Sequence, residues 1–90
     1  MLFRSLAEID PATNRLRRSI PVGWCPEGLA VGESGVWVRD IPGGTHPLTS
    51  IIYRIDPTSG KVVAAIEVPG QGGDLAVGES GVWVTTGEPN

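Results

Sequence analysis

A ten-residue segment, LAVGESGVWV, occurs twice in this sequence, at Leu29–Val38 and again at Leu75–Val84. The two occurrences lie 46 residues apart, and the same offset superposes the Ile-Asp-Pro segments at residues 9–11 and 55–57. Aligned without a gap, residues 7–44 and 53–90 share 15 identities over 38 positions. We therefore interpret residues 1–90 as one domain built from two tandem repeat units.

Each repeat unit carries the signals of four short strands. A turn with two glycines between two apolar runs is a hairpin signal, and Gly32–Gly35 is such a turn. A second turn begins with Asp56-Pro57, which suits a type I turn, and Gly60 and its equivalent Asn14 tolerate a left-handed backbone. The four predicted strands, in spatial order, are Gly28–Val31, Val36–Arg39, Ser50–Ile55 and Lys61–Val68.

Four-stranded repeats of about 40–50 residues are typical of β-propeller blades. Along the second predicted strand, Val36 and Val38 point to one face and Trp37 to the other, so both faces are apolar, as in a blade between two neighbours. We predict an all-β propeller fold with two blades per chain, in which Trp37 and Trp83 are core residues. A sandwich or barrel of two duplicated halves is the alternative.

Composition narrows the range of functions. Lys plus Arg number 7 and Asp plus Glu number 10, a net charge of −3, which argues against nucleic-acid and anionic-membrane partners. No apolar run reaches the ~18 residues of a membrane span, and the first residues do not resemble a signal peptide, so we expect a soluble protein in an unspecified compartment. A single cysteine, Cys25, excludes an intrachain disulfide and a cysteine-based zinc site. No nucleotide-binding or zinc motif is present, so we predict no cofactor.

Two blades cannot close a propeller, which typically has 4–8. Numbered by their place in a blade, the strands follow one another along the chain as third, fourth, first, second, third, fourth, first and second. The first two and the last two strands of the chain therefore each form half a blade. Two periods of 46 make 92 residues and the chain has 90, which suits copies joined head to tail in a ring. We favour a trimer of six blades over a tetramer of eight. The alternative is a chain cut from a longer propeller.

The blade segments resemble the YVTN-type repeats and the virginiamycin B lyase-like propellers. The residues that carry this resemblance are IDPTSGKVV at 55–63 and LAVGESGVWV at 75–84, and it extends over nearly the whole chain. It implies a propeller fold, although such families are usually single chains of about seven blades. The lyases open a cyclic ester antibiotic with a histidine and a bound magnesium ion, and only His46 matches such a base. Small bacterial fucose-binding lectins, whose two-blade chains trimerise, offer an architectural precedent.

The meander places the loops at two ends of each blade. One end, the repeated-turn end, carries the GESG and Asp-Pro turns, which differ little between the units. The other, the variable-loop end, carries residues 23–27, 39–49, 69–73 and 85–90, which differ between the units. Function usually resides in loops that vary on a rigid scaffold. The candidate site residues at the variable-loop end are Trp24, Arg39, Asp40, His46, Asp74 and Glu88.

Each candidate also has a purely structural interpretation. His46 is either a base or ligand or a solvated loop histidine, and Trp24 either stacks on a ligand or packs at the channel mouth. Cys25 lacks an adjacent His or Lys to lower its pKa, which favours an unreactive thiol. Carboxylates such as Glu27 and Asp74 could gather a divalent cation in a symmetric ring. The outer-strand arginines at 15, 17 and 18 suit a solvated rim.

Three functional hypotheses are consistent with these residues. The leading one is a non-catalytic, self-assembling propeller that serves as a scaffold or binds a small molecule or glycan at the variable-loop end. The second is a lyase-like enzyme with His46 as the base and a metal held by loop carboxylates. The third is a propeller fragment without an independent function.

Overall fold

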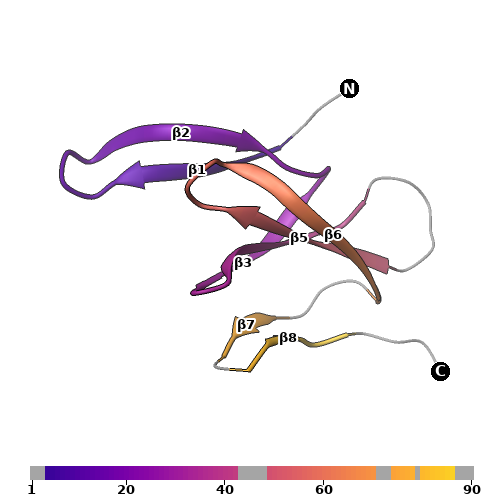
Figure 1. The fold of residues 1–90 in the computed structure, drawn as a ribbon. Helices are drawn as coiled ribbons and strands as arrows, with labels where there is room; N and C mark the ends of the chain where they lie inside the picture. Colours follow the sequence, from indigo (N-terminus) through magenta and orange to yellow (C-terminus); the bar gives the residue numbers. More distant parts are fainter. Residues whose placement is uncertain (1–3, 43–48, 71–73, 79, 87–90) are drawn as a thin grey trace.

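The computed structural model describes residues 4–42, 49–70, 74–78 and 80–86, which form eight β-strands in three antiparallel sheets (Figure 1). The prediction of an all-β chain is confirmed. These residues contain no helix long and apolar enough to cross a membrane. The strands are β1 (Ser5–Asp10), β2 (Arg15–Pro21), β3 (Pro26–Gly32), β4 (Gly35–Asp40), β5 (Thr49–Asp56), β6 (Lys61–Pro69), β7 (Leu75–Val77) and β8 (Val82–Val84).

The sheets divide the strands into groups of two, four and two. β1 pairs with β2, the strands β3-β4-β5-β6 form the central sheet in that order, and β7 pairs with β8. Every described pairing joins strands that are consecutive in the chain. The four predicted strands of the complete unit correspond to β3–β6, each longer than expected by one to three residues.

The predicted Asp-Pro turns have the expected local structure. Asp10 and Asp56 each accept, through Oδ1, a hydrogen bond of 2.9 Å from the backbone N–H two residues ahead. The amides of Asn14 and Gly60 donate to the backbone carbonyls of the same two aspartates at 2.7 Å. Asn14 and Gly60 have φ values of +59° and +74°, so the left-handed position that closes the turn is occupied by the residue types that tolerate it best.

The central sheet lies between the two hairpins (Figure 1). On one face, Val38 of β4 and Ile55 of β5 are buried together with Ile20 of β2 and Val22, which follows β2, and Tyr53 packs against them. Side chains alternate along a strand, so Trp37 and Arg39 point to the other face. Arg39 reaches the C-terminal end of β8 there. Both faces of the central sheet are therefore in contact with another sheet.

The contact between β3 and β7 joins large side chains to small ones. Leu75 and Val77 of β7 lie against Gly28 and Gly32 of β3, where a Cβ on Gly32 would overlap the Val77 side chain. Gly32 has an ordinary backbone conformation, so the space for Val77, rather than the dihedral angles, requires glycine at this position.

The two repeated tryptophans differ in exposure. Trp37 is half-buried, with Nε1 donating to Ser34 Oγ at 3.0 Å and the Arg54 guanidinium 5.6 Å from its ring centroid. Trp83 is 67% exposed. The prediction of a core position is therefore wrong for Trp83 within one chain. No described sheet covers the outer face of β8, whereas β7 and β8 lie over the corresponding face of β4.

Candidate functional site

Four of the six predicted site residues are among the described residues, in two groups: Asp40 contacts the backbone of Trp24, and Arg39 and Asp74 each contact Thr85. Arg39 and Asp40 lie at the end of β4, Trp24 lies in the connection between β2 and β3, and Asp74 directly precedes β7. The other two, His46 and Glu88, lie outside the described residues. β4 continues one residue beyond the predicted strand end at Arg39, so Asp40 is a strand residue rather than a loop residue. Arg39 and Asp40 pair with Ile52 and Ile51 of β5, and both are buried.

Asp40 holds the connection between the first hairpin and the central sheet. Its Oδ1 accepts hydrogen bonds from the backbone N–H groups of Trp24, at 2.7 Å, and Cys25, at 2.6 Å. Gly23 precedes them with φ +69°, and any Cβ there would overlap the Asp40 carboxyl group. A buried carboxylate oxygen that accepts two amide hydrogen bonds is well satisfied, so Asp40 fixes this loop through Oδ1.

Arg39 is fully buried between the central sheet and the end of β8. Its Nε donates to Ser50 Oγ at 3.2 Å, and its Nη1 donates to the backbone carbonyl of Thr85 at 3.1 Å. The Ser50 hydroxyl in turn donates to the carbonyl of Gly70 at 2.7 Å. Nη2 of Arg39 has no hydrogen-bond partner among the described residues. The network joins the ends of β4, β5, β6 and β8.

Asp74 and Trp24 are the exposed members of the set. The backbone N–H of Asp74 donates to Thr85 Oγ1 at 2.7 Å, and its carbonyl accepts from Thr85 N at 3.1 Å, so the Asp74 backbone closes the β7–β8 hairpin while its side chain stays in solvent. Trp24 is 45% exposed on a loop that Asp40 anchors. Its exposed indole offers an aromatic surface for stacking on a ligand.

The described residues do not form a metal centre at this end. No group of three or more His, Cys, Asp or Glu side chains within residues 4–42, 49–70, 74–78 and 80–86 is arranged to hold an ion. Glu27 Oε2 instead accepts a contact of 3.6 Å from Cys25 Sγ. The expected gathering of Glu27 and Asp74 carboxylates around a cation concerns a symmetric ring of chains and stays a prediction.

Asp40 also affects the only tyrosine in the sequence. Burial raises the pKa of Tyr53, and the negative charge of Asp40 raises it further. Tyr53 packs against the core shared by the first hairpin and the central sheet. Its ionisation therefore reports on the packing of these two sheets.

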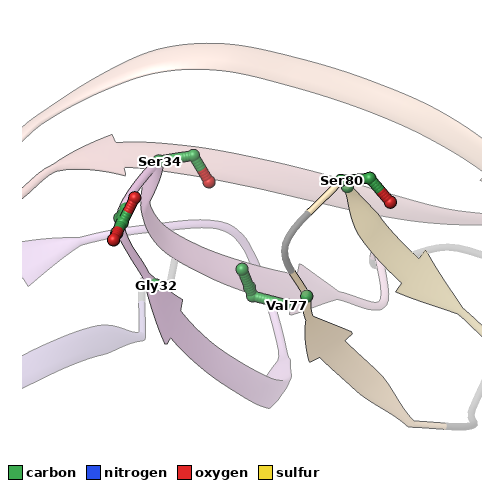
Figure 2. Close-up of a pocket in the computed structure, with 7 residues that line it drawn as sticks. Gly32, Ser34, Val77 and Ser80 are labelled. Carbon is green, nitrogen blue, oxygen red and sulfur yellow. The ribbon is translucent and has the colours of Figure 1, made fainter.

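A hollow lies at the opposite, repeated-turn end. It has a volume of about 770 Å³ and lies between the Gly32–Gly35 turn of the central sheet and the turn that joins β7 to β8 (Figure 2). Ser34 and Ser80 come from equivalent positions of the two repeat units. The sequence predicts only a structural role for these turns. The identical GESG sequences at 32–35 and 78–81 indicate two equivalent turns, which neighbouring blades would place side by side.

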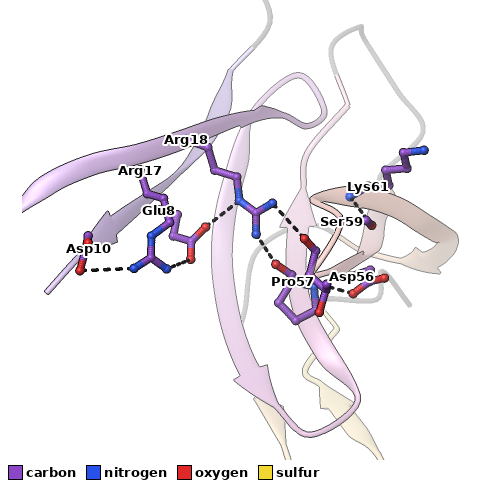
Figure 3. Close-up of polar contacts among 9 residues, drawn as sticks. Glu8, Asp10, Arg17, Arg18, Asp56, Pro57, Ser59 and Lys61 are labelled. Atoms are coloured by element: carbon purple, nitrogen blue, oxygen red, sulfur yellow. Dashed lines mark hydrogen bonds and ion pairs between the residues drawn. The ribbon is translucent and has the colours of Figure 1, made fainter. Parts of the chain in front are cut away.

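The outer-strand arginines do more than form a solvated rim (Figure 3). Arg18 Nε donates to Glu8 Oε1 at 2.6 Å, and its Nη2 donates to the carbonyl of Pro57 in the turn after β5. Arg17 bridges Glu8 at 3.0 Å and Asp10 at 3.3 Å. The hydrogen bond from Arg18 and the charges of both arginines lower the pKa of the half-buried Glu8. Arg18 therefore ties the first hairpin to the central sheet, whereas the rim prediction gave it no contact.

Comparison with known proteins provides no family assignment. No protein-family model matches this chain, and neither the curated proteins nor the solved structures yielded a match.

Proposed function

We propose that this chain is a two-blade unit that assembles head to tail with copies of itself into a closed β-propeller, a trimer of six blades or a tetramer of eight. The assembled ring acts as a non-catalytic scaffold or binding module. The observation that carries this proposal is that residues at equivalent positions of the two repeat units differ in burial. Ile55 in the central sheet is fully buried, whereas the equivalent Ile9 in the first hairpin is 56% exposed.

The exposed faces of β3 and β7 match each other. Leu29 and Val31 project from the face of β3 opposite β7, and Val31 is 68% exposed. Ala76 and Gly78 lie on the outer face of β7 and are also exposed. Leu29 and Val31 are the equivalents of Leu75 and Val77, and Gly78 is the equivalent of Gly32, whereas Asp74 occupies the position of Gly28. We therefore expect Leu29 and Val31 to pack on Ala76 and Gly78 of the preceding chain.

The strand edges also support a junction between chains. Among the described residues, β1 pairs only with β2 and β8 only with β7, so each has a free edge (Figure 1). Joining β8 to β1 of the next chain gives a sheet in the order β7-β8-β1-β2, equivalent to β3-β4-β5-β6. Within the central sheet Val36 pairs with Ile55 and Val38 with Tyr53. The 46-residue offset then pairs Val82 with Ile9 and Val84 with Ala7.

The apolar hollow beside β3 is a further argument for this junction. It measures about 350 Å³ and is lined by residues of the first hairpin and of β3 and β4, among them Ile9, Leu29 and Val31. Within the chain, β7 and β8 cover the opposite face of the central sheet, but no described strand covers this hollow. The β7–β8 hairpin of the preceding chain has the shape and apolar surface to fill this hollow, which makes a second copy of the chain the partner we propose.

We place any ligand of the ring at the variable-loop end. Trp24 offers an exposed aromatic surface on a loop fixed by the buried Asp40 carboxylate, so a planar apolar or sugar ring could stack there without a large ordering cost. The lyase-like alternative rests on His46, which lies outside the described residues. No described contact favours it over the binding module.

Light scattering after size-exclusion chromatography tests the assembly. We expect a single mass near three or four times 9.5 kDa. Val31→Asp should release folded monomers, because it places a charge in the apolar junction. Ala65→Asp is the matched control, since Ala65 is exposed on the outermost strand β6, away from the junction. A wild-type chain that stays monomeric at high micromolar concentration, or a Val31→Asp variant that assembles like the control, would refute the proposal.

A further inference from the structure

We infer that Arg4 of one chain reaches across the junction and donates a hydrogen bond to the side chain of Thr85 in the preceding chain. This contact deepens the proposed assembly and rests on it. It is the counterpart, with donor and acceptor exchanged between strands, of the buried Arg39–Ser50 contact in the central sheet.

The central sheet provides the template. Arg39 on β4 and Ser50 on β5 are both fully buried, and Arg39 Nε donates to Ser50 Oγ at 3.2 Å. Arg39 pairs across the ladder with Ile52, so Ser50 lies two residues further along β5 on the same face. The guanidinium therefore reaches its hydroxyl partner diagonally across two strands of one sheet.

The repeat offset places the same two functional groups at the junction, but on opposite strands. Residue 85, equivalent to Arg39, is a threonine, and residue 4, equivalent to Ser50, is an arginine. Where the central sheet has a guanidinium on its second strand and a hydroxyl on its third, the junction sheet has a hydroxyl on β8 and a guanidinium just before β1. Within one chain, Arg4 and Thr85 are both exposed.

The local structure prepares both residues for this contact. The carbonyl of Arg4 accepts a hydrogen bond of 3.0 Å from Val22 N, which fixes the backbone from which its side chain extends. Thr85 Oγ1 accepts one hydrogen bond, from Asp74 N at 2.7 Å, and a hydroxyl oxygen has a second lone pair. That lone pair is the acceptor we assign to the Arg4 guanidinium.

The exchange also identifies the partner as a second copy of this chain. An arginine at position 4 and a threonine at position 85 complement each other only if their strands pair in the register of β4 and β5. An unrelated partner on either edge would not require this combination. A guanidinium on both strands would place two like charges together, and a hydroxyl on both would omit the long side chain that spans the strands.

The test exchanges the two residues back to the order of the central sheet. Arg4→Ser and Thr85→Arg each remove the complementary pair, and we expect each to raise the dissociation constant of the assembly about 10- to 100-fold, the effect of one charge-assisted hydrogen bond. The double variant Arg4→Ser/Thr85→Arg restores a guanidinium–hydroxyl pair and should return to within a few-fold of wild type. Sedimentation equilibrium gives the constants, and circular dichroism verifies that each chain is folded.

Arg15→Ser is the matched control, since it removes an exposed arginine from β2 without touching the junction. It should assemble like wild type. If wild type assembles but the free-energy losses of the two single variants simply add in the double variant, the Arg4–Thr85 contact is refuted, whereas the proposed ring is not. If wild type is monomeric, both proposals are refuted.

Discussion

Gly32 and Gly78 occupy the same position of the two repeat units, so one substitution in each separates folding from assembly. A Cβ at Gly32 would overlap the Val77 side chain, whereas a Cβ at Gly78 would meet Trp83 Nε1 at 3.7 Å, an ordinary contact. Neither glycine has a positive φ, so alanine fits the backbone at both. Gly32→Ala should therefore loosen the β3–β7 contact within the chain, and Gly78→Ala should leave the single chain intact.

In the assembled ring Gly78 faces Val31 of the next chain, as Gly32 faces Val77 within the chain. Overpacking of this kind costs about 1–3 kcal/mol. We therefore expect Gly78→Ala to raise the dissociation constant about 5- to 150-fold per junction while the melting temperature of the diluted, monomeric chain stays unchanged. Gly32→Ala should lower that melting temperature.

Both quantities come from one dilution series, with mass measured by light scattering and unfolding by tryptophan fluorescence. Assembly of Gly78→Ala as tight as that of wild type would refute the proposed β3–β7 junction. A melting temperature of the monomer reduced as much as in Gly32→Ala would show that Gly78 is needed inside the chain instead.

Three further predictions follow from the fold and the site. In a Cys25→Ser background, oxidation of the Ala7→Cys/Val84→Cys chain should give a covalently closed ring on non-reducing gels, and a product that stays monomeric would contradict the predicted register. Asp40→Ala should lower the free energy of unfolding by about 3 kcal/mol, because two amides lose a charged acceptor. Asp40→Asn retains one acceptor oxygen, so its free energy of unfolding should fall less. Equal losses of both variants in denaturant titrations would contradict the role of Oδ1. Absorbance at alkaline pH should show Tyr53 ionising above its ordinary pKa of about 10. The folded chain holds this proton more tightly than the unfolded chain, so it loses stability as the pH rises through the raised pKa. Asp40→Asn should lower the pKa of Tyr53, and an unchanged titration midpoint would exclude the Asp40 carboxylate as a cause.

Much of the fold can be predicted from the sequence because its signals are local. An Asp-Pro turn closes through the side chain of its own aspartate, and the alternation of Val36, Trp37 and Val38 gives β4 apolar side chains on both faces, so neither depends on distant residues. The burial of a given side chain is different. Trp37 and Trp83 lie in identical ten-residue segments, yet their exposure differs because it depends on which sheet lies beside each strand.

The candidate site was harder to predict for the same reason. Arg39 is the last residue of the predicted second strand and Asp40 follows it, at the point where the two units diverge, and charged residues there do not predict burial. In the structure the strand continues, because Asp40 accepts amides from a loop 15 and 16 residues away and Arg39 meets a strand 46 residues away. Such partners have no signature in a single sequence. The reach of Arg18 to Pro57 is a third contact of this kind.

The exclusive pairing of consecutive strands has a consequence for how the assembly forms in time. Every described pairing lies within a hairpin or between adjacent strands of the meander, so each can form on microsecond to millisecond timescales without a long loop to close. The junction sheet, in contrast, requires the encounter of two chains. Refolding should accordingly show a fast phase independent of protein concentration, followed by a slower phase whose rate rises with concentration.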